Sequence, residues 1–102
     1  MTERIEFGVK HPNSVEFFSF DFTSRLASSE IITGATFFIT LKSGVDSNPS
    51  AMLSGPAIYT DKTTSQLVQG GIVPNTYELA VLITTSEGQS LPGCGYFTVQ
   101  PC

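Results

Sequence analysis

The chain has 102 residues, which is long enough for one domain and too short for two. Its formal net charge is −4, and only 14% of its residues are charged. Its five lysines and arginines stand singly, whereas binding nucleic acid needs clustered cations, so we expect no direct nucleic-acid contact. No apolar run reaches the roughly 18–20 residues of a membrane-spanning helix, and no membrane association is expected.

Residues 1–14 read as a polar N-terminal arm. Ile5, Phe7 and Val9 alternate with other residues, and Pro12 separates this short stretch from the first long strand pattern. So short a strand makes too few contacts to hold itself, and it would gain by adding to an exposed sheet edge. We expect the arm to become ordered against a neighbouring subunit or partner, with folding back on its own domain as the alternative.

The remaining residues, 15–102, are predicted to form one all-β domain. Val15–Phe22 and Ile31–Leu41 show the period of two that is typical of strands, and Thr76–Thr85 is the longest clean alternation. Turn-forming segments separate shorter strand patterns at Ala51–Leu53, Ala57–Thr60, Thr64–Gln69 and about Gln89–Val99, the last interrupted by a bulge or bend at Pro92–Gly95. About seven short strands without a helical period indicate an immunoglobulin-like β-sandwich of about seven antiparallel strands.

Asn75-Thr76-Tyr77 stands at the start of the longest strand, just after a Gly/Pro corner. This arrangement resembles the tyrosine corner of immunoglobulin-like folds, in which the tyrosine hydroxyl bonds to backbone across the corner. The chain has no tryptophan, so the Cys…Trp…Cys pattern of antibody domains is absent. We expect Tyr77 and Phe20 in the core.

No set of residues has the pattern of a catalytic, metal or cofactor site. The single histidine, His11, lies in the arm, where nothing would hold it for a Ser–His or Cys–His pair. Asp46 and Asn48 resemble calcium-loop ligands, but the required glycine and the closing glutamate are missing. No helix follows Gly70-Gly71 to present a phosphate-binding N-terminus. We therefore expect no enzyme, no cofactor and no bound metal.

The two cysteines, Cys94 and Cys102, are too few for a disulfide scaffold and are consistent with a protein made in the cytosol. The first residues, Met1–Ile5, also lack the basic-then-apolar order of a signal peptide. We expect two thiols, and a Cys94–Cys102 bridge stays open as an alternative if the tail folds back.

Phenylalanine is unusually frequent: the chain has eight, with adjacent pairs at 17–18 and 37–38. A sandwich strand buries one face only, so one member of each pair should point outward. Contiguous exposed apolar patches mark contact sites, and the low charge content also favours an interface at Phe17 or Phe38. The alternative is that the arm or a long loop covers these rings. The candidate interface residues are therefore Ile5, Phe7, Val9, Phe17 and Phe38.

The segment Phe17-Phe18-Ser19-Phe20-Asp21-Phe22-Thr23-Ser24-Arg25-Leu26 resembles the aromatic-Asp-hydroxyl-x-x-Leu start of small virion proteins of tailed phages. Further segments resemble this family in order and spacing, namely Glu30–Thr36, Leu67–Gly71, Thr76-Tyr77 and Thr84–Gln89. The resemblance covers about residues 15–99. Members are commonly described as fibre–tail adaptors, and similar immunoglobulin-like modules serve as neck, collar or capsid-decoration components. The arm and the Cys-terminated tail are not features expected of the family.

The resemblance implies a virion structural protein, made in the host bacterial cytoplasm, that joins particle components through protein–protein contacts. The expected role is a tail- or neck-region adaptor for fibres. The implied partners are tail, neck or fibre components or the capsid, together with further copies of the chain in a homo-oligomer. A capsid decoration (cement) protein is the first alternative. A carbohydrate-binding adhesin-like module is the second, although sugar sites stack on tryptophan or tyrosine and only three tyrosines are present.

Overall fold

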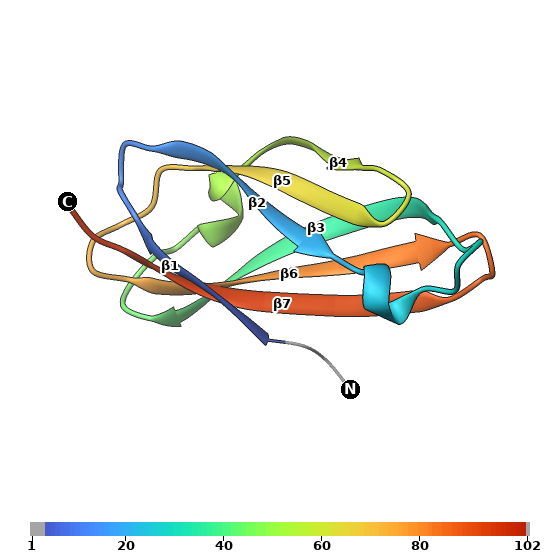
Figure 1. The fold of residues 1–102 in the computed structure, drawn as a ribbon. Coiled ribbons are helices and arrows are strands. Elements are labelled where there is room, and N and C mark those ends of the chain that lie inside the picture. The colour runs from blue at the N-terminus through green and yellow to red at the C-terminus, as the bar shows by residue number, and fades with distance from the viewer. Residues whose placement is uncertain (1–3, 102) are drawn as a thin grey trace.

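The computed structural model describes the backbone of residues 4–101 and the side chains of residues 7–101. The described chain forms seven strands and two short 3-10 turns: β1 (Arg4–Lys10), β2 (Val15–Asp21), η1 (Thr23–Arg25), β3 (Ile32–Ser43), η2 (Pro49–Met52), β4 (Leu53–Tyr59), β5 (Thr63–Gln69), β6 (Thr76–Thr85) and β7 (Ser90–Val99). A four-stranded sheet, β1-β7-β6-β3, packs on a three-stranded sheet, β2-β5-β4 (Figure 1). The predicted all-β sandwich is confirmed. Among residues 4–101, neither helical turn has the length or the apolar character that crossing a membrane requires.

Four of the strand pairs are antiparallel, but β1 runs parallel to β7, which differs from the expected all-antiparallel arrangement. The reason is that β1 and β2 belong to different sheets, so the chain crosses the open side of the sandwich at residues 11–14. Strand β1 lies on the free edge of β7 and runs in the same direction as β7. The immunoglobulin-like classification stays a prediction, which the order of strands in the two sheets supports.

The segment expected as an arm is a strand of the same sandwich. Residues Arg4–Lys10 pair with β7 from Arg4 opposite Cys94 to Lys10 opposite Val99. The boundary expected between residues 14 and 15 therefore separates two strands of one fold. The pairing supplies the contacts that a lone strand would lack.

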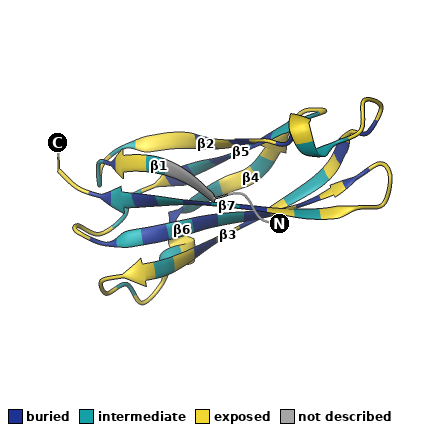
Figure 2. Ribbon diagram, turned by 60° about the horizontal axis from the view of Figure 1, so that its bottom comes forward, coloured by how far each residue is buried: buried dark blue, intermediate teal, exposed yellow. Residues whose placement is uncertain are grey.

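The core lies between the two sheets, and buried residues alternate with less buried ones along β5, β6 and β7 (Figure 2). Phe20 is 2% exposed and Tyr77 is fully buried, as predicted. The other buried apolar side chains are Phe18, Phe22, Ile32, Phe37, Ile39, Met52, Val68, Leu79, Val81, Ile83, Phe97 and Val99. Burying one such aliphatic or phenylalanine side chain contributes roughly 1.5–3 kcal/mol.

Strand limits differ from prediction where glycine and proline interrupt the pattern. Residues 51–53 and 57–60 were expected as separate strands, but β4 is continuous through Gly55-Pro56 and only its pairing with β5 is irregular there. The bend expected at Pro92–Gly95 is absent, because β6 and β7 stay in register throughout. The carbonyl of Pro92 accepts a hydrogen bond from Arg25 at 2.5 Å. The carbonyl of Pro92 thus points away from β6. Proline has no backbone N–H, and at this position its absence removes no hydrogen bond between the two strands.

Candidate interaction surfaces

Phe38 lies on the outer face of the four-stranded sheet. Side chains alternate along β3, so its neighbour Phe37 is buried while Phe38 is 51% exposed. Its cross-strand partner on β6 is Ala80, and Leu82, two residues further along β6, is 43% exposed. Neither the N-terminal strand nor a loop covers the ring. This face therefore presents an apolar patch centred on Phe38 and Leu82.

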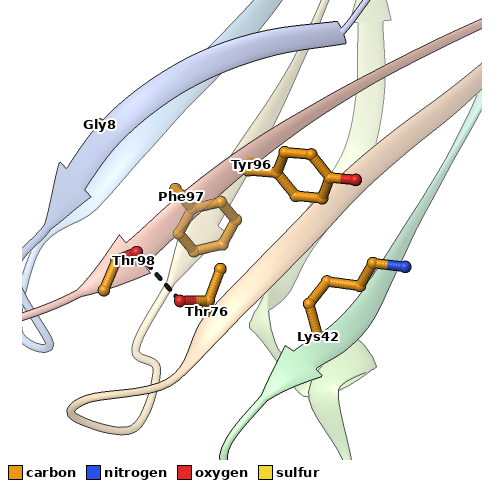
Figure 3. Close-up of a pocket in the computed structure, with 6 residues that line it drawn as sticks. All are labelled: Gly8, Lys42, Thr76, Tyr96, Phe97 and Thr98. Atoms are coloured by element: carbon orange, nitrogen blue, oxygen red, sulfur yellow. Dashed lines mark hydrogen bonds between the residues drawn. The ribbon is translucent and has the colours of Figure 1, made fainter.

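A pocket of about 360 Å³ opens on the same outer face, towards the end of β7 (Figure 3). Its lining comes from all four strands of the sheet and comprises Gly8, Lys42, Thr76, Tyr96, Phe97 and Thr98. The hydroxyls of Thr76 and Thr98 are hydrogen-bonded at 3.1 Å across β6 and β7, which fixes one wall. The volume is at the small end for ligand sites, which suits one ring or one inserted side chain.

The charged groups of this face balance one another. Among the side chains that the structure describes, those of Lys42 and Glu78 carry its charge, and their Nζ and Oε1 atoms are 3.8 Å apart. The side chain of Lys42 is 43% exposed and that of Glu78 is 19% exposed. An ion pair this exposed contributes about 0–1 kcal/mol to stability, so its main effect is to keep the face electrically neutral.

The three-stranded sheet has a second apolar outer face. Phe17 is 56% exposed, Val15 on the same strand is 57% exposed, and Ile58 on β4 is 51% exposed. Leu67 lies directly opposite Phe17 on β5 and is half-buried. Phe17 and Phe38 thus both lie on open outer faces, one on each sheet. Among the residues that the structure describes, neither the N-terminal segment nor a loop covers these rings, contrary to the alternative.

The N-terminal candidates Phe7 and Val9 differ in burial, and β1 contains an irregularity between them at Gly8. The register with β7 shifts between Glu6 and Gly8, and Gly8 has φ +83°, a conformation that glycine adopts without strain. Phe7 consequently turns inward and packs on the core, whereas Val9 is 65% exposed. Phe7 therefore belongs to the core of its own chain, contrary to expectation. Ile5 lies opposite Gly95 in β1, and its side chain is outside the described residues.

Lys10 is a buried cation that sequence reasoning missed. Its side chain is fully buried, and Nζ donates hydrogen bonds to the carbonyl oxygens of His11 at 3.1 Å, Ser14 at 2.6 Å and Gly70 at 2.8 Å. Burial lowers the pKa of Lys10, and the nearby charge of Glu16 opposes this effect. The available signal was Gly8 inside a strand pattern, which marks a bulge and reverses which residues face inward.

The predicted tyrosine corner is present. The hydroxyl of Tyr77 accepts hydrogen bonds from the backbone N–H of Ile72 at 3.3 Å and from Nδ2 of Asn75 at 3.2 Å, and it donates to Oδ2 of Asp46 at 2.8 Å. Burial is the main cause that raises the pKa of Tyr77. This hydroxyl therefore joins the loop after β3 to the corner before β6.

The loops at this end of the sandwich enclose a second, more polar hollow of about 500 Å³, whose lining includes Asn13, Asp46, Asn48, Met52 and Gln69. Oδ1 of Asp46 accepts the backbone N–H of Asn48 at 2.9 Å, in keeping with turn chemistry for this loop. Within the part of the chain that the structure describes, no three or more His, Cys, Asp or Glu side chains come together as metal ligands would.

Of the remaining candidates of the sequence, Cys94 lies opposite Ala80 on the outer face of the four-stranded sheet, and Cys102 cannot be placed. His11 lies in the turn between β1 and β2, where its Nδ1 accepts the backbone N–H of Asn13 at 3.0 Å. Cys94 is half-buried on β7. Cys102 lies outside the described residues, so the Cys94–Cys102 alternative stays open.

Exposed apolar patches on the outer faces of a small β-sandwich are typical of surfaces that bind other proteins. Residues 10–94 match the family described as podophage GP4 fiber-tail adaptor protein gp77. The chain belongs to this family of fibre–tail adaptors of tailed phages, which confirms the resemblance seen in the sequence. No curated protein matches the chain.

Proposed function

We propose that the chain joins tail and fibre components of a phage particle, using the outer faces of its two sheets as contact surfaces. Membership of a structural adaptor family supports a location in the virion and a non-enzymatic role. The matched residues, 10–94, include β2 to β6 and the first half of β7, so they contain both Phe17 and Phe38.

The observation that carries the proposal is the exposure of Phe17 and Phe38, at 56% and 51%. Each ring follows or precedes a buried phenylalanine on its own strand, so neither is needed to fill the core. Large aromatic rings in contact with water are costly on a monomer and are enriched at protein interfaces. An adaptor has at least two partners, and the sandwich offers one apolar face on each sheet.

The placement of the cations supports protein partners rather than nucleic acid. Lys10 is buried on three carbonyls, and Lys62 donates to the carbonyl oxygens of Ala27 at 2.8 Å and Glu30 at 2.5 Å. Arg25 is bound to Pro92, and Lys42 is paired with Glu78. Phosphate binding relies on cations that lie together on one face and are free to contact the backbone.

The proposal can be tested by supplying variants in trans to a phage that lacks this gene. Phe17→Ser and Phe38→Ser remove one outer ring each, and Val45→Ser is the matched control because Val45 is 83% exposed but lies in the loop after β3. We expect the control to restore particles with fibres, and at least one phenylalanine variant to yield tails without fibres. Fibres counted by electron microscopy at wild-type numbers for both phenylalanine variants would refute the use of these faces.

A further inference from the structure

One face of the molecule carries both a projecting ring and a hollow that could receive such a ring. Phe38 stands on β3 opposite Ala80 of β6, and the pocket is lined at Thr76, four residues along β6 from Ala80. At roughly 3.4 Å per residue, the two features are roughly 14 Å apart along the strands. The pocket volume of about 360 Å³ suits a single inserted side chain.

We propose that a second copy of this chain docks face to face on the four-stranded sheet, with the Phe38 ring of each copy in the pocket of the other. A two-fold interface is made of the same patch on both partners, so a surface that holds both a knob and its hole is self-complementary. This inference rests on the proposed function and names one of the adaptor's partners; the dimer then presents two faces with Phe17, one for the tail and one for a fibre.

Charge favours a second copy on this face. The chain has a net charge of −4, so contact between two copies is least unfavourable where the local charge is balanced. On this face the described charges are one cation, Lys42, and one anion, Glu78. The outer face of the three-stranded sheet has the exposed Asp21 at one end, and no lysine or arginine lies on β2, β4 or β5. Pairing of copies through that face would therefore bring like charges together.

The size of the face is close to what a standard interface needs. Four strands at a spacing of about 4.8 Å and a length of roughly 30 Å give a flat area of roughly 600 Å², and projecting side chains increase the accessible area. A standard interface needs about 800 Å² from each partner. Because Phe38 is 51% exposed, each inserted ring would bury about half of the roughly 150–250 Å² that a fully buried aromatic side chain covers.

A disulfide cross-link tests the arrangement directly. In a Cys94→Ser, Cys102→Ser background, Phe38→Cys is combined with Thr98→Cys, which lines the pocket. Strand β6 lies between β3 and β7, so these positions are about 9.6 Å or more apart within one chain, beyond the roughly 7 Å limit for a disulfide. We expect oxidation to give covalent dimers. The control pair Phe17→Cys with Thr98→Cys should stay monomeric, and equal or absent dimer in both pairs would overturn the inference.

Sedimentation of the unmodified chain completes the test at micromolar concentration. We expect wild type and Phe17→Ser to sediment as dimers and Phe38→Ser as a monomer with an unchanged melting temperature. A wild-type chain that is monomeric at every concentration would overturn the inference of a dimer. The proposed function would still stand in that case if particles with Phe38→Ser lacked fibres. Conversely, dimers that form while all variant particles keep their fibres would support this interface and refute the adaptor role of the faces.

Discussion

The ring of Phe7 stacks on the ring of Phe18, with 4.8 Å between the centroids and 14° between the planes. Phe7 belongs to β1 in one sheet and Phe18 to β2 in the other, so the contact closes the sandwich on the side where the chain crosses between sheets. Phe20 meets Phe7 edge-on at 5.4 Å. The N-terminal strand is thereby fastened to the core by an aromatic cluster as well as by its pairing with β7.

We expect Phe7→Ala to lower the free energy of unfolding by about 2 kcal/mol, less than the roughly 3–5 kcal/mol of a fully buried phenylalanine because Phe7 is only half-buried. For a domain of this size the melting temperature should fall by roughly 8–16 °C. Val9→Ala on the same strand is the control, since Val9 points outward, and it should melt within a degree or two of wild type. Equal melting of Phe7→Ala and wild type would show that β1 does not stabilise the domain.

Tyr77→Phe is predicted to destabilise the domain by about 1–3 kcal/mol, because it removes a fully buried hydroxyl that bonds the backbone N–H of Ile72 and Oδ2 of Asp46. Tyr59→Phe is the matched control. The hydroxyl of Tyr59 also donates a hydrogen bond, to the carbonyl of Thr33 at 2.9 Å, but Tyr59 is 44% exposed and water can replace it. Urea unfolding of both variants measures the difference, and similar midpoints would contradict the role of the corner.

Glu30 joins three segments through its carboxylate. Oε2 accepts hydrogen bonds from the hydroxyl of Thr85 at 2.5 Å and from Nε2 of Gln89 at 2.7 Å, and Oε1 accepts the backbone N–H of Ala27 at 3.1 Å. These bonds, that of Thr85 first, lower the pKa of Glu30 below its ordinary value. The carboxylate therefore ties the connector before β3 to the hairpin between β6 and β7.

The lowered pKa makes stability depend on pH in the acid range. The Glu30 carboxylate binds a proton more readily in the unfolded chain than in the folded chain. Its contribution to stability is therefore fully present above the ordinary glutamate pKa of about 4.3 and is lost as pH falls through the lowered pKa. Thr85→Val removes the largest cause, so we expect a weaker dependence of stability on pH below about 4.3. Thr85→Ser keeps a hydroxyl and should keep the wild-type dependence. Parallel pH profiles of wild type and Thr85→Val would exclude this role of Glu30.

Phe20→Ala should lower the free energy of unfolding by about 3–5 kcal/mol, because its ring is 2% exposed in the core. Phe17→Ala and Phe38→Ala should leave the isolated domain nearly as stable as wild type, since both rings contact water. If all three variants melt alike, the assignment of inner and outer faces is wrong.

Strand content and core were predictable from the sequence because alternation is a local signal. Thr76–Thr85 is a strand with the predicted limits, and the two adjacent phenylalanine pairs each place one ring inside and one outside. The tyrosine corner could also be predicted, since a Gly/Pro corner before an alternating strand has few other uses. Its partner Asp46 could not, because it comes from a loop about 30 residues earlier in the chain.

The N-terminal region is not a separate arm but folds back on its own domain, as the alternative interpretation had it, and the reason for the difference is physical. A single irregularity at Gly8 reverses the alternation, so Phe7 faces the core, Val9 faces solvent and Lys10 is buried. Nothing local distinguishes a free arm from an edge strand, since the pairing with β7 joins residues about 90 apart in sequence. The pocket beside Tyr96 was not foreseen either, because it depends on residues from four different strands.

The central claim is that the chain works at the junction of tail and fibre. The most direct measurement is to locate it in the particle, by cryo-electron microscopy of virions that carry the chain with a small added domain after residue 102. The account predicts extra density where the fibres meet the tail, and none on the capsid shell. Density distributed over the capsid lattice would contradict the adaptor role and favour a decoration protein.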